Sequence, residues 1–219
     1  TIVRDLQARL WRDRKRLWDG SAPSDPVDIL DPAIAVHLVG YEFLLADGLG
    51  QFQSGSGVIE VAGLIDRTSR TVHVSRQFPL PVQTFTAAHE LGHAVLRPIG
   101  GGVHRDRAID GPNQSRDRFE LEADKFATYF LLPANLVRKR FEALFGTAMF
   151  FLSEETAFAL CGLAIQDVRR KYSTRRHLSR LLAGAEQYNG RHFVSLAVQF
   201  RVSIEAMAIR LEELELLSR

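Results

Sequence analysis

The sequence predicts an α+β fold, in which a small β-hairpin lies beside a helix and an all-helical region follows. Segments 58–65 and 71–75 are rich in β-branched residues and flank a four-residue polar turn, a pattern typical of a hairpin. From residue 134 onward, about five segments follow helical spacing without a strand signal. We therefore predict two regions, residues 1–133 and residues 134–219.

The N-terminal part predicts two helices and a loop. Apolar residues recur at spacings of four or seven over residues 2–18 and basic residues fill the remainder, which indicates a helix with a basic outer face. After three prolines, residues 33–45 favour a second, more apolar helix. Four glycines within residues 47–57 favour a mobile loop.

Two further helices enclose a glycine-rich stretch. Pro81 and Pro98 bracket a helix of about four turns. Residues 97–114 contain three consecutive glycines and a Gly-Pro pair, so we expect a loop there. Residues 118–132 are helical again and stop at Pro133.

Composition limits the class of protein. The 219 residues suit one domain or one domain with a small appendage, and 46% hydrophobic with 25% charged residues is close to the globular average. The 28 basic and 26 acidic residues exclude a histone-like protein and an acidic disordered one. One cysteine excludes an internal disulfide framework. Without an apolar run near roughly 18 residues or a signal-peptide pattern, we expect a soluble, cytoplasmic protein that does not contact membranes.

A histidine pair forms the first half of a candidate metal site. His89 and His93 are four residues apart, so both imidazoles lie on one helix face and can reach a single ion. Glu90 projects in a neighbouring direction, from which it can contact a water on that ion. Two histidine ligands and a glutamate general base are the arrangement of zinc peptidases. The alternative is a surface helix with unrelated histidines.

Residues 118–132 offer the third ligand that a catalytic zinc needs. The buried stripe of this helix follows a three-and-four spacing and comprises Phe119, Ala123, Phe126, Ala127 and Phe130. Glu120 and Asp124 lie together along one edge of the stripe. Glu122 is about 200° around the helix from Glu120, with Lys125 as a surface ion-pair partner. Helix geometry therefore favours Glu120 over Glu122 as the ligand, with Asp124 holding an imidazole N–H.

Two segments resemble those of a known family. Residues 85–93, which read FTAAHELGH, are similar to the FTLAHELGH stretch of the ImmA/IrrE-type zinc metallopeptidases. Residues 120–133 are similar to the ExxAN-x-FA…LLMP segment of that family. The sequence departs at Asp124, where many members have Asn, and at Leu132, where Met is usual. Since Asn and Asp both accept an imidazole N–H, the departure at Asp124 leaves the expected site intact.

The resemblance implies a fold, a chemistry and a substrate. It implies a zincin-like catalytic domain in which His89, His93 and Glu120 bind Zn²⁺ and Glu90 is the catalytic base. Zinc would lower the pKa of a bound water to about 7, and Glu90 would pass the proton of that water to the leaving amine. It also implies a specific cut in a helix-turn-helix transcriptional repressor during a bacterial stress, DNA-damage or anti-phage response.

Two features of the substrate site are left open by the sequence. The hairpin over residues 58–75 is the candidate edge strand for a substrate that binds as an added strand. The group that stabilises the oxyanion has three candidates, Tyr129, His104 and Arg105, and a packing or loop role is the alternative for each of them.

A basic segment, residues 169–180, is a candidate nucleic-acid contact. It has six positive charges beside a tyrosine and no acidic residue, which suits a phosphate backbone with stacked bases. Relatives in the resembled family respond to DNA damage, which makes single-stranded DNA a candidate activator. Solvated helix faces are the alternative. The candidate contacts are Arg169, Arg170, Lys171, Arg175, Arg176 and Arg180.

The C-terminal end predicts helix, short turn and helix over residues 194–217, with Ser203 as an N-cap. The second of these helices has four glutamates and one arginine over residues 204–216, the wrong sign for a helix that enters the major groove. A packing or partner-binding role is therefore favoured. The second functional hypothesis is a single-stranded-DNA-binding sensor with a structural or vestigial zinc site. The intact His89–Glu90 pair argues against it, because a structural site is closed by four ligands.

Overall fold

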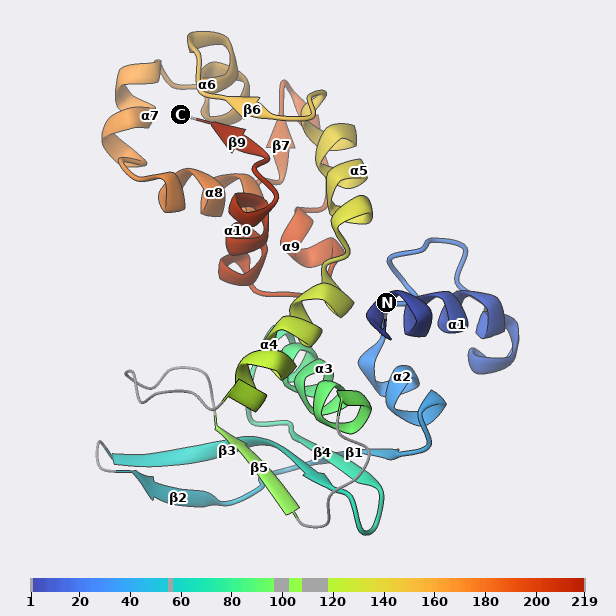
Figure 1. Cartoon of the computed structure of the whole chain (residues 1–219). Coiled ribbons are helices and arrows are strands. Elements are labelled where there is room, and N and C mark those ends of the chain that lie inside the picture. The colour runs from blue at the N-terminus through green and yellow to red at the C-terminus, as the bar shows by residue number, and fades with distance from the viewer. Residues whose placement is uncertain (1, 55–56, 97–102, 108–117, 219) are drawn as a thin grey trace. The chain divides into compact units, whose positions relative to one another are not determined.

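The chain forms two compact units, Thr1–Leu131 and Leu132–Arg219, and the boundary lies two residues before the predicted one at Pro133. The fold class is α+β, as predicted: the first unit combines helices with a mixed sheet, and the second is mostly helical. No described helix is long and apolar enough to cross a bilayer. The computed structural model (Figure 1) describes residues 2–54, 57–96, 103–107 and 118–218.

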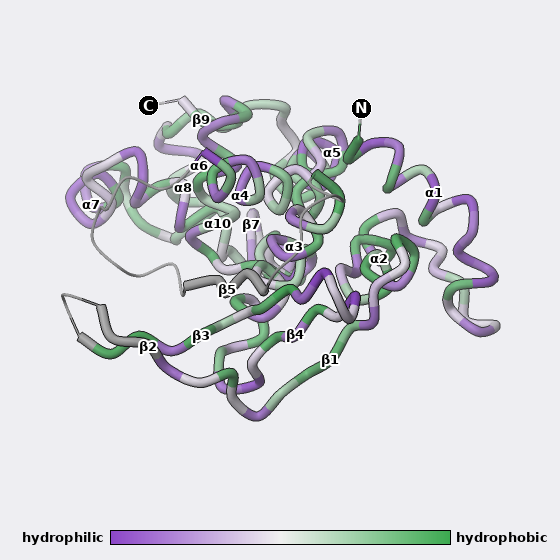
Figure 2. The backbone as a smooth tube through the Cα atoms, turned by 60° about the horizontal axis from the view of Figure 1, so that its bottom comes forward, coloured by the Kyte–Doolittle hydropathy of each residue, from purple (hydrophilic) through white to green (hydrophobic). Residues whose placement is uncertain are grey.

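The first helix, α1, spans Ile2–Leu17 and is amphipathic, as predicted. Its residues are mostly hydrophilic (Figure 2), whereas Leu6 and Leu10 are buried. The Gln7 side-chain amide donates to two backbone carbonyls near the end of α4, Arg118–Leu131, at 3.0 and 3.2 Å. These contacts attach α1 to α4.

The helix predicted over residues 33–45 is too long. Helix α2, Pro32–Leu38, is preceded by the N-cap residue Asp31, whose carboxylate accepts two backbone N–H groups. The chain turns at Gly40, where φ is +86°, and then forms strand β1, Glu42–Ala46. This strand pairs in parallel with β4. The partner strand comes from a later part of the chain, so local periodicity could not indicate β1.

The predicted hairpin is confirmed. Strand β3, Gly57–Asp66, and strand β4, Thr71–Ser75, pair antiparallel across the polar turn. The predicted loop over residues 47–57 is wrong in part, because Gln51–Ser54 forms strand β2 against the first half of β3. The sheet order is β1-β4-β3-β2, and β5, Val103–Arg107, also pairs with β3.

The part of the hairpin in which β3 and β4 pair with each other is not an edge of the sheet, so the prediction of an edge hairpin is corrected there. β4 lies between β1 and β3. Along residues 63–66, β3 pairs with β4 on one side and with β5 on the other. Within the described strands β1, β2 and β5 each have one neighbour, and β5 provides the open edge beside residues 61–66 of β3.

Helix α3, Leu80–Leu96, contacts β3 and β4 of the sheet and also α4 (Figure 1). It begins within one residue of the predicted start at Pro81. Because α3 is covered from both directions, its central residues 86–94 are all buried. This placement puts the candidate ligands inside the first unit.

The second unit contains short helices, as predicted, and four two-residue strands that the sequence did not indicate. The Asn189–Gly190 turn, with φ of 50° and 73°, joins β7 to β8 and is a hairpin signal that the helical interpretation overlooked. Ser203 caps α10 as predicted and accepts from the Ala206 N–H. The elements are α5 (Ala134–Phe145), β6 (Phe150–Phe151), α6 (Glu154–Cys161), α7 (Ile165–Lys171), α8 (Arg175–Gly184), β7 (Gln187–Tyr188), β8 (Arg191–His192), α9 (Leu196–Gln199), α10 (Ile204–Glu213) and β9 (Leu217–Ser218).

Candidate metal centre

Three polar side chains in the middle of the largely apolar helix α3 are buried. His89, Glu90 and His93 are 3%, 0% and 3% exposed. Polar groups that are withdrawn from water need defined partners, because burial without them costs free energy. The i, i+4 spacing of the histidines brings their imidazoles together, with the ring centroids 4.7 Å apart.

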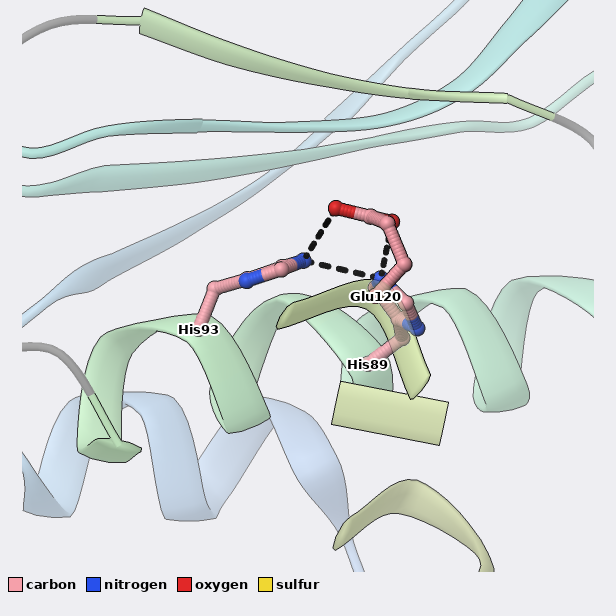
Figure 3. Close-up of side chains that lie close together, drawn as sticks. All are labelled: His89, His93 and Glu120. Atoms are coloured by element: carbon pink, nitrogen blue, oxygen red, sulfur yellow. Dashed lines mark hydrogen bonds and ion pairs between the residues drawn. The ribbon is translucent and has the colours of Figure 1, made fainter. Parts of the chain in front are cut away.

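Helix α4 supplies a carboxylate to this pair (Figure 3). One oxygen of Glu120 lies 3.3 Å from His89 Nε2, and the other lies 3.4 Å from His93 Nε2. The two Nε2 atoms are 2.9 Å apart. The structure therefore brings together the three residues that the sequence indicated as ligands, from two helices separated by more than twenty residues of chain.

This donor set fits a tetrahedral metal ion. Zinc bonds to nitrogen and oxygen at about 2.0–2.2 Å, so neighbouring donors in a tetrahedral site lie roughly 3.3 Å apart. The two observed nitrogen–oxygen distances match this separation, and the nitrogen–nitrogen distance is slightly shorter. Among the described residues, His89, His93 and Glu120 form a group whose ligand atoms all lie within 4.8 Å of one another.

Asp124 orients one of the imidazoles. Its Oδ1 lies 2.9 Å from His89 Nδ1, one helical turn after Glu120. A carboxylate accepts hydrogen bonds, so Nδ1 carries the proton and donates it. The lone pair of His89 is thereby left on Nε2, the atom that faces Glu120.

We expect Asp124→Ala to weaken zinc binding by about 10- to 100-fold, because the His89 ring loses the group that fixes its tautomer and orientation. Asp124→Asn should lose less, since its amide oxygen can still accept from Nδ1. Competition against a chromogenic chelator at fixed pH measures both affinities. Equal zinc affinity in Asp124→Ala and the native protein would contradict this role.

A glycine allows α3 and α4 to approach closely. A Cβ added at Gly92 would lie 3.2 Å from the Cα of Ala123 and 3.2 Å from the Cβ of Phe126. This contact holds the helices at a separation that lets Glu120 reach the histidines. A glycine inside a helix is a sequence signal of close packing, and it could have indicated this role for Gly92.

The remaining predictions for α4 are corrected in two places. Glu122 pairs with Arg118 at 3.0 Å rather than with Lys125, and its side chain is directed away from the histidines to a 39%-exposed position. Phe119 is 37% exposed and lies outside the buried stripe, whereas the other four predicted members are buried. Phe119 occupies the first turn of α4.

The structure separates one oxyanion candidate from the site. Tyr129 lies nine residues beyond Glu120 on the same helix, a rise of about 13 Å. This distance exceeds the reach of a tyrosine side chain, so Tyr129 is not the donor. The side chains of the other two candidates, His104 and Arg105, lie outside the described residues.

The basic segment is partly tied to the acidic last helix of the same unit. Arg176 on α8 contacts Glu212 at 2.8 Å and Glu205 at 2.5 Å on α10, and Arg180 also pairs with Glu205. Hydrogen bonds from Arg176 lower the pKa of Glu212 to about 2, and the pKa of Arg176 is raised. The acidic residues of α10 thus help this helix pack against α8. This agrees with the packing role that the negative charge of α10 favoured.

The other predicted nucleic-acid contacts are less constrained. Arg175 donates to the Glu212 carbonyl at 3.3 Å, and Arg170 forms an exposed pair with Asp167 at 3.3 Å. Lys171 lies 5.5 Å from the centroid of the Tyr172 ring, and Arg169 is exposed. The C-terminal turn of α7 is therefore the part of the segment most available to a phosphate backbone.

The fold and the site together define a class of protein. An α+β unit in which two histidines and a glutamate of one buried helix meet a carboxylate from a second helix has the arrangement of metallopeptidases. Residues 55–154 match the IrrE N-terminal-like domain family, Peptidase_M78. This match agrees with the predicted resemblance, and the matched segment contains all four residues of the site. A comparison with curated proteins finds no match.

Proposed function

We propose that the protein is a zinc-dependent endopeptidase that makes a specific cut in a protein substrate. The observation that carries the proposal is the donor set, in which three of the described side chains converge while Glu90 is buried on α3 next to His89. Three protein ligands are the number found in catalytic zinc sites, whereas structural sites use four. This difference favours an enzyme over the alternative, a nucleic-acid-binding sensor with a structural or vestigial site.

Each residue of the site has a task in this reaction. When bound, zinc would polarise the scissile carbonyl and acidify a water molecule. His89, His93 and Glu120 would hold the ion, and Asp124 would keep His89 in the required tautomer. Glu90 would take the proton from the attacking water and deliver it to the leaving amine.

The substrate would bind as an added strand at the open edge of β5. β3 contacts α3 beside Glu90, and β5 pairs with this part of β3. An extended segment paired with β5 gains main-chain hydrogen bonds in a defined register. This arrangement replaces the hairpin edge that the sequence favoured.

The proposed substrate is a helix-turn-helix transcriptional repressor, and the proposed setting is a cytoplasmic stress, DNA-damage or anti-phage response. The family match supports a peptidase, and the choice of substrate rests on the resemblance of residues 85–93 and 120–133. Single-stranded DNA is the proposed activator, and the α7 residues Arg169, Arg170 and Lys171 are its proposed contacts.

The test is to incubate the zinc-loaded protein with the repressor encoded beside it, with and without single-stranded DNA. Mass spectrometry of the products locates the cut. A single cleavage site that requires zinc supports the proposal, and faster cleavage with DNA supports the activator. DNA binding without cleavage under any condition favours the sensor instead.

A further inference from the structure

One glycine of the sheet lies where a side chain would collide with the candidate base. Gly63 is in the middle of β3 and faces α3. A Cβ built on it would lie 2.4 Å from Cγ2 of Thr86 and 2.8 Å from Oε1 of Glu90. Among the glycines that the structure describes, this is the position with contacts shorter than 3.0 Å.

The backbone does not require glycine at this position. The glycines with positive φ lie elsewhere, so an alanine could adopt the conformation of Gly63. Where a methyl group has room, alanine in place of glycine lowers the conformational entropy of the unfolded chain and so stabilises the fold. The reason for glycine is therefore the space that its missing side chain leaves.

The strand cannot move away to make room. Gly63 is opposite Val74 of β4 and Asp106 of β5, so backbone ladders hold β3 from both sides. A β-bulge between Val61 and Gly63 shifts the register next to this point, and bulges commonly re-aim a strand beside a functional site. The groups that must yield to a side chain at 63 are those on α3.

We propose that Gly63 is a positioning residue for Glu90, and this rests on the proposed role of Glu90 as the base. Thr86 and Glu90 are four residues apart on α3 and form one ridge that faces β3. Both are buried, at 4% and 0% exposed, so neither side chain has solvent into which it can turn. The slot above Gly63 therefore sets the position of the Glu90 carboxylate.

The decisive variant is Gly63→Ala combined with Thr86→Ser. Serine lacks Cγ2 and so removes the 2.4 Å contact, while the 2.8 Å contact with Glu90 stays. Thr86→Ser alone is the background control. Gly184→Ala is the matched glycine control, because its Cβ would lie 3.0 Å from Cδ1 of Ile204 in the second unit.

Two measurements on the full chain separate the roles. In the cobalt-substituted protein, metal content and visible absorption report the site without any substrate. We expect Gly63→Ala/Thr86→Ser to bind cobalt fully but to change the absorption bands in the direction that Glu90→Gln does. With a substrate that the native protein cleaves, kcat should fall at least about 10-fold, whereas KM should stay within about twofold of the native value. The reason is that a displaced base slows the chemical step and leaves substrate binding unchanged. Both control variants should match the native protein in spectrum and kcat.

The outcomes are distinguishable. A native spectrum and kcat in the double variant, or loss of cobalt from it, would overturn the proposal. If the double variant does not fold, Glu90→Ala is added to it. If the triple variant folds and binds cobalt, the Glu90 carboxylate is the group that the methyl displaces. If the triple variant is unfolded, Gly63 is needed only for packing of the sheet, and the proposal is overturned. If the native protein cleaves nothing, the proposed function fails while the cobalt spectra still decide the role of Gly63.

Discussion

Glu90→Gln is expected to retain zinc and to lose cleavage by about 10²- to 10⁴-fold, the usual contribution of a general base. Glutamine has the shape of glutamate but cannot take up a proton from water at neutral pH. The side chain is fully buried between α3 and β3, so a change of size would disturb packing, whereas this change preserves volume. The loss should appear in kcat with little change in KM.

The experiment needs metal content and rate from the same preparation. Zinc per chain is measured by mass spectrometry, and the rate by the appearance of the cleaved repressor. Glu60→Gln is the matched control, because Glu60 is exposed on β3 and contacts Gln51 at 3.3 Å, outside the site. Zinc-replete Glu90→Gln with more than half of the native rate would exclude Glu90 as the base.

Glu120→Ala is expected to reduce zinc affinity by at least about 100-fold. This loss is larger than the loss expected when a residue that only orients a ligand is removed. The alanine removes both carboxylate oxygens that face the two histidine Nε2 atoms. The remaining histidine pair offers two donors, one short of the catalytic number. Cleavage should then fail because the metal is absent, and saturating zinc should restore part of it.

Glu122→Ala is the matched control on the same helix. Its carboxylate pairs with Arg118 and is directed away from the site, so zinc affinity should be unchanged and stability should change by less than about 1 kcal/mol. Titration of both proteins with zinc against a competing chelator compares them. Equal affinities in the two variants would remove Glu120 from the ligand set.

Much of the site could be predicted because it depends on local geometry. The i, i+4 spacing of His89 and His93 fixes both rings on one helix face, whatever the rest of the fold does. The same rule placed Glu120 and Asp124 on one edge of α4 and separated Glu122 from them. The sequence could not show the distance between the two helices, which depends on the contact of Gly92 with Ala123.

The errors of prediction lie where pairing is not local. β1 follows α2 without a strand pattern of its own and forms because β4, about thirty residues later, offers a parallel partner. In the same way, Arg176 and Arg180 look like a free basic surface in the sequence. In the folded second unit they contact Glu205 and Glu212, more than twenty residues away.

The sequence by itself determined which residues are the candidates for the chemistry, since helical periodicity and residue type single out His89, Glu90, His93 and Glu120. Only the tertiary structure decided which of the described strands have an open edge and why β3 has a glycine at position 63. Both depend on contacts between backbones that are distant in the chain. Such contacts are selected by packing and by hydrogen bonds across the fold, and no local pattern records them.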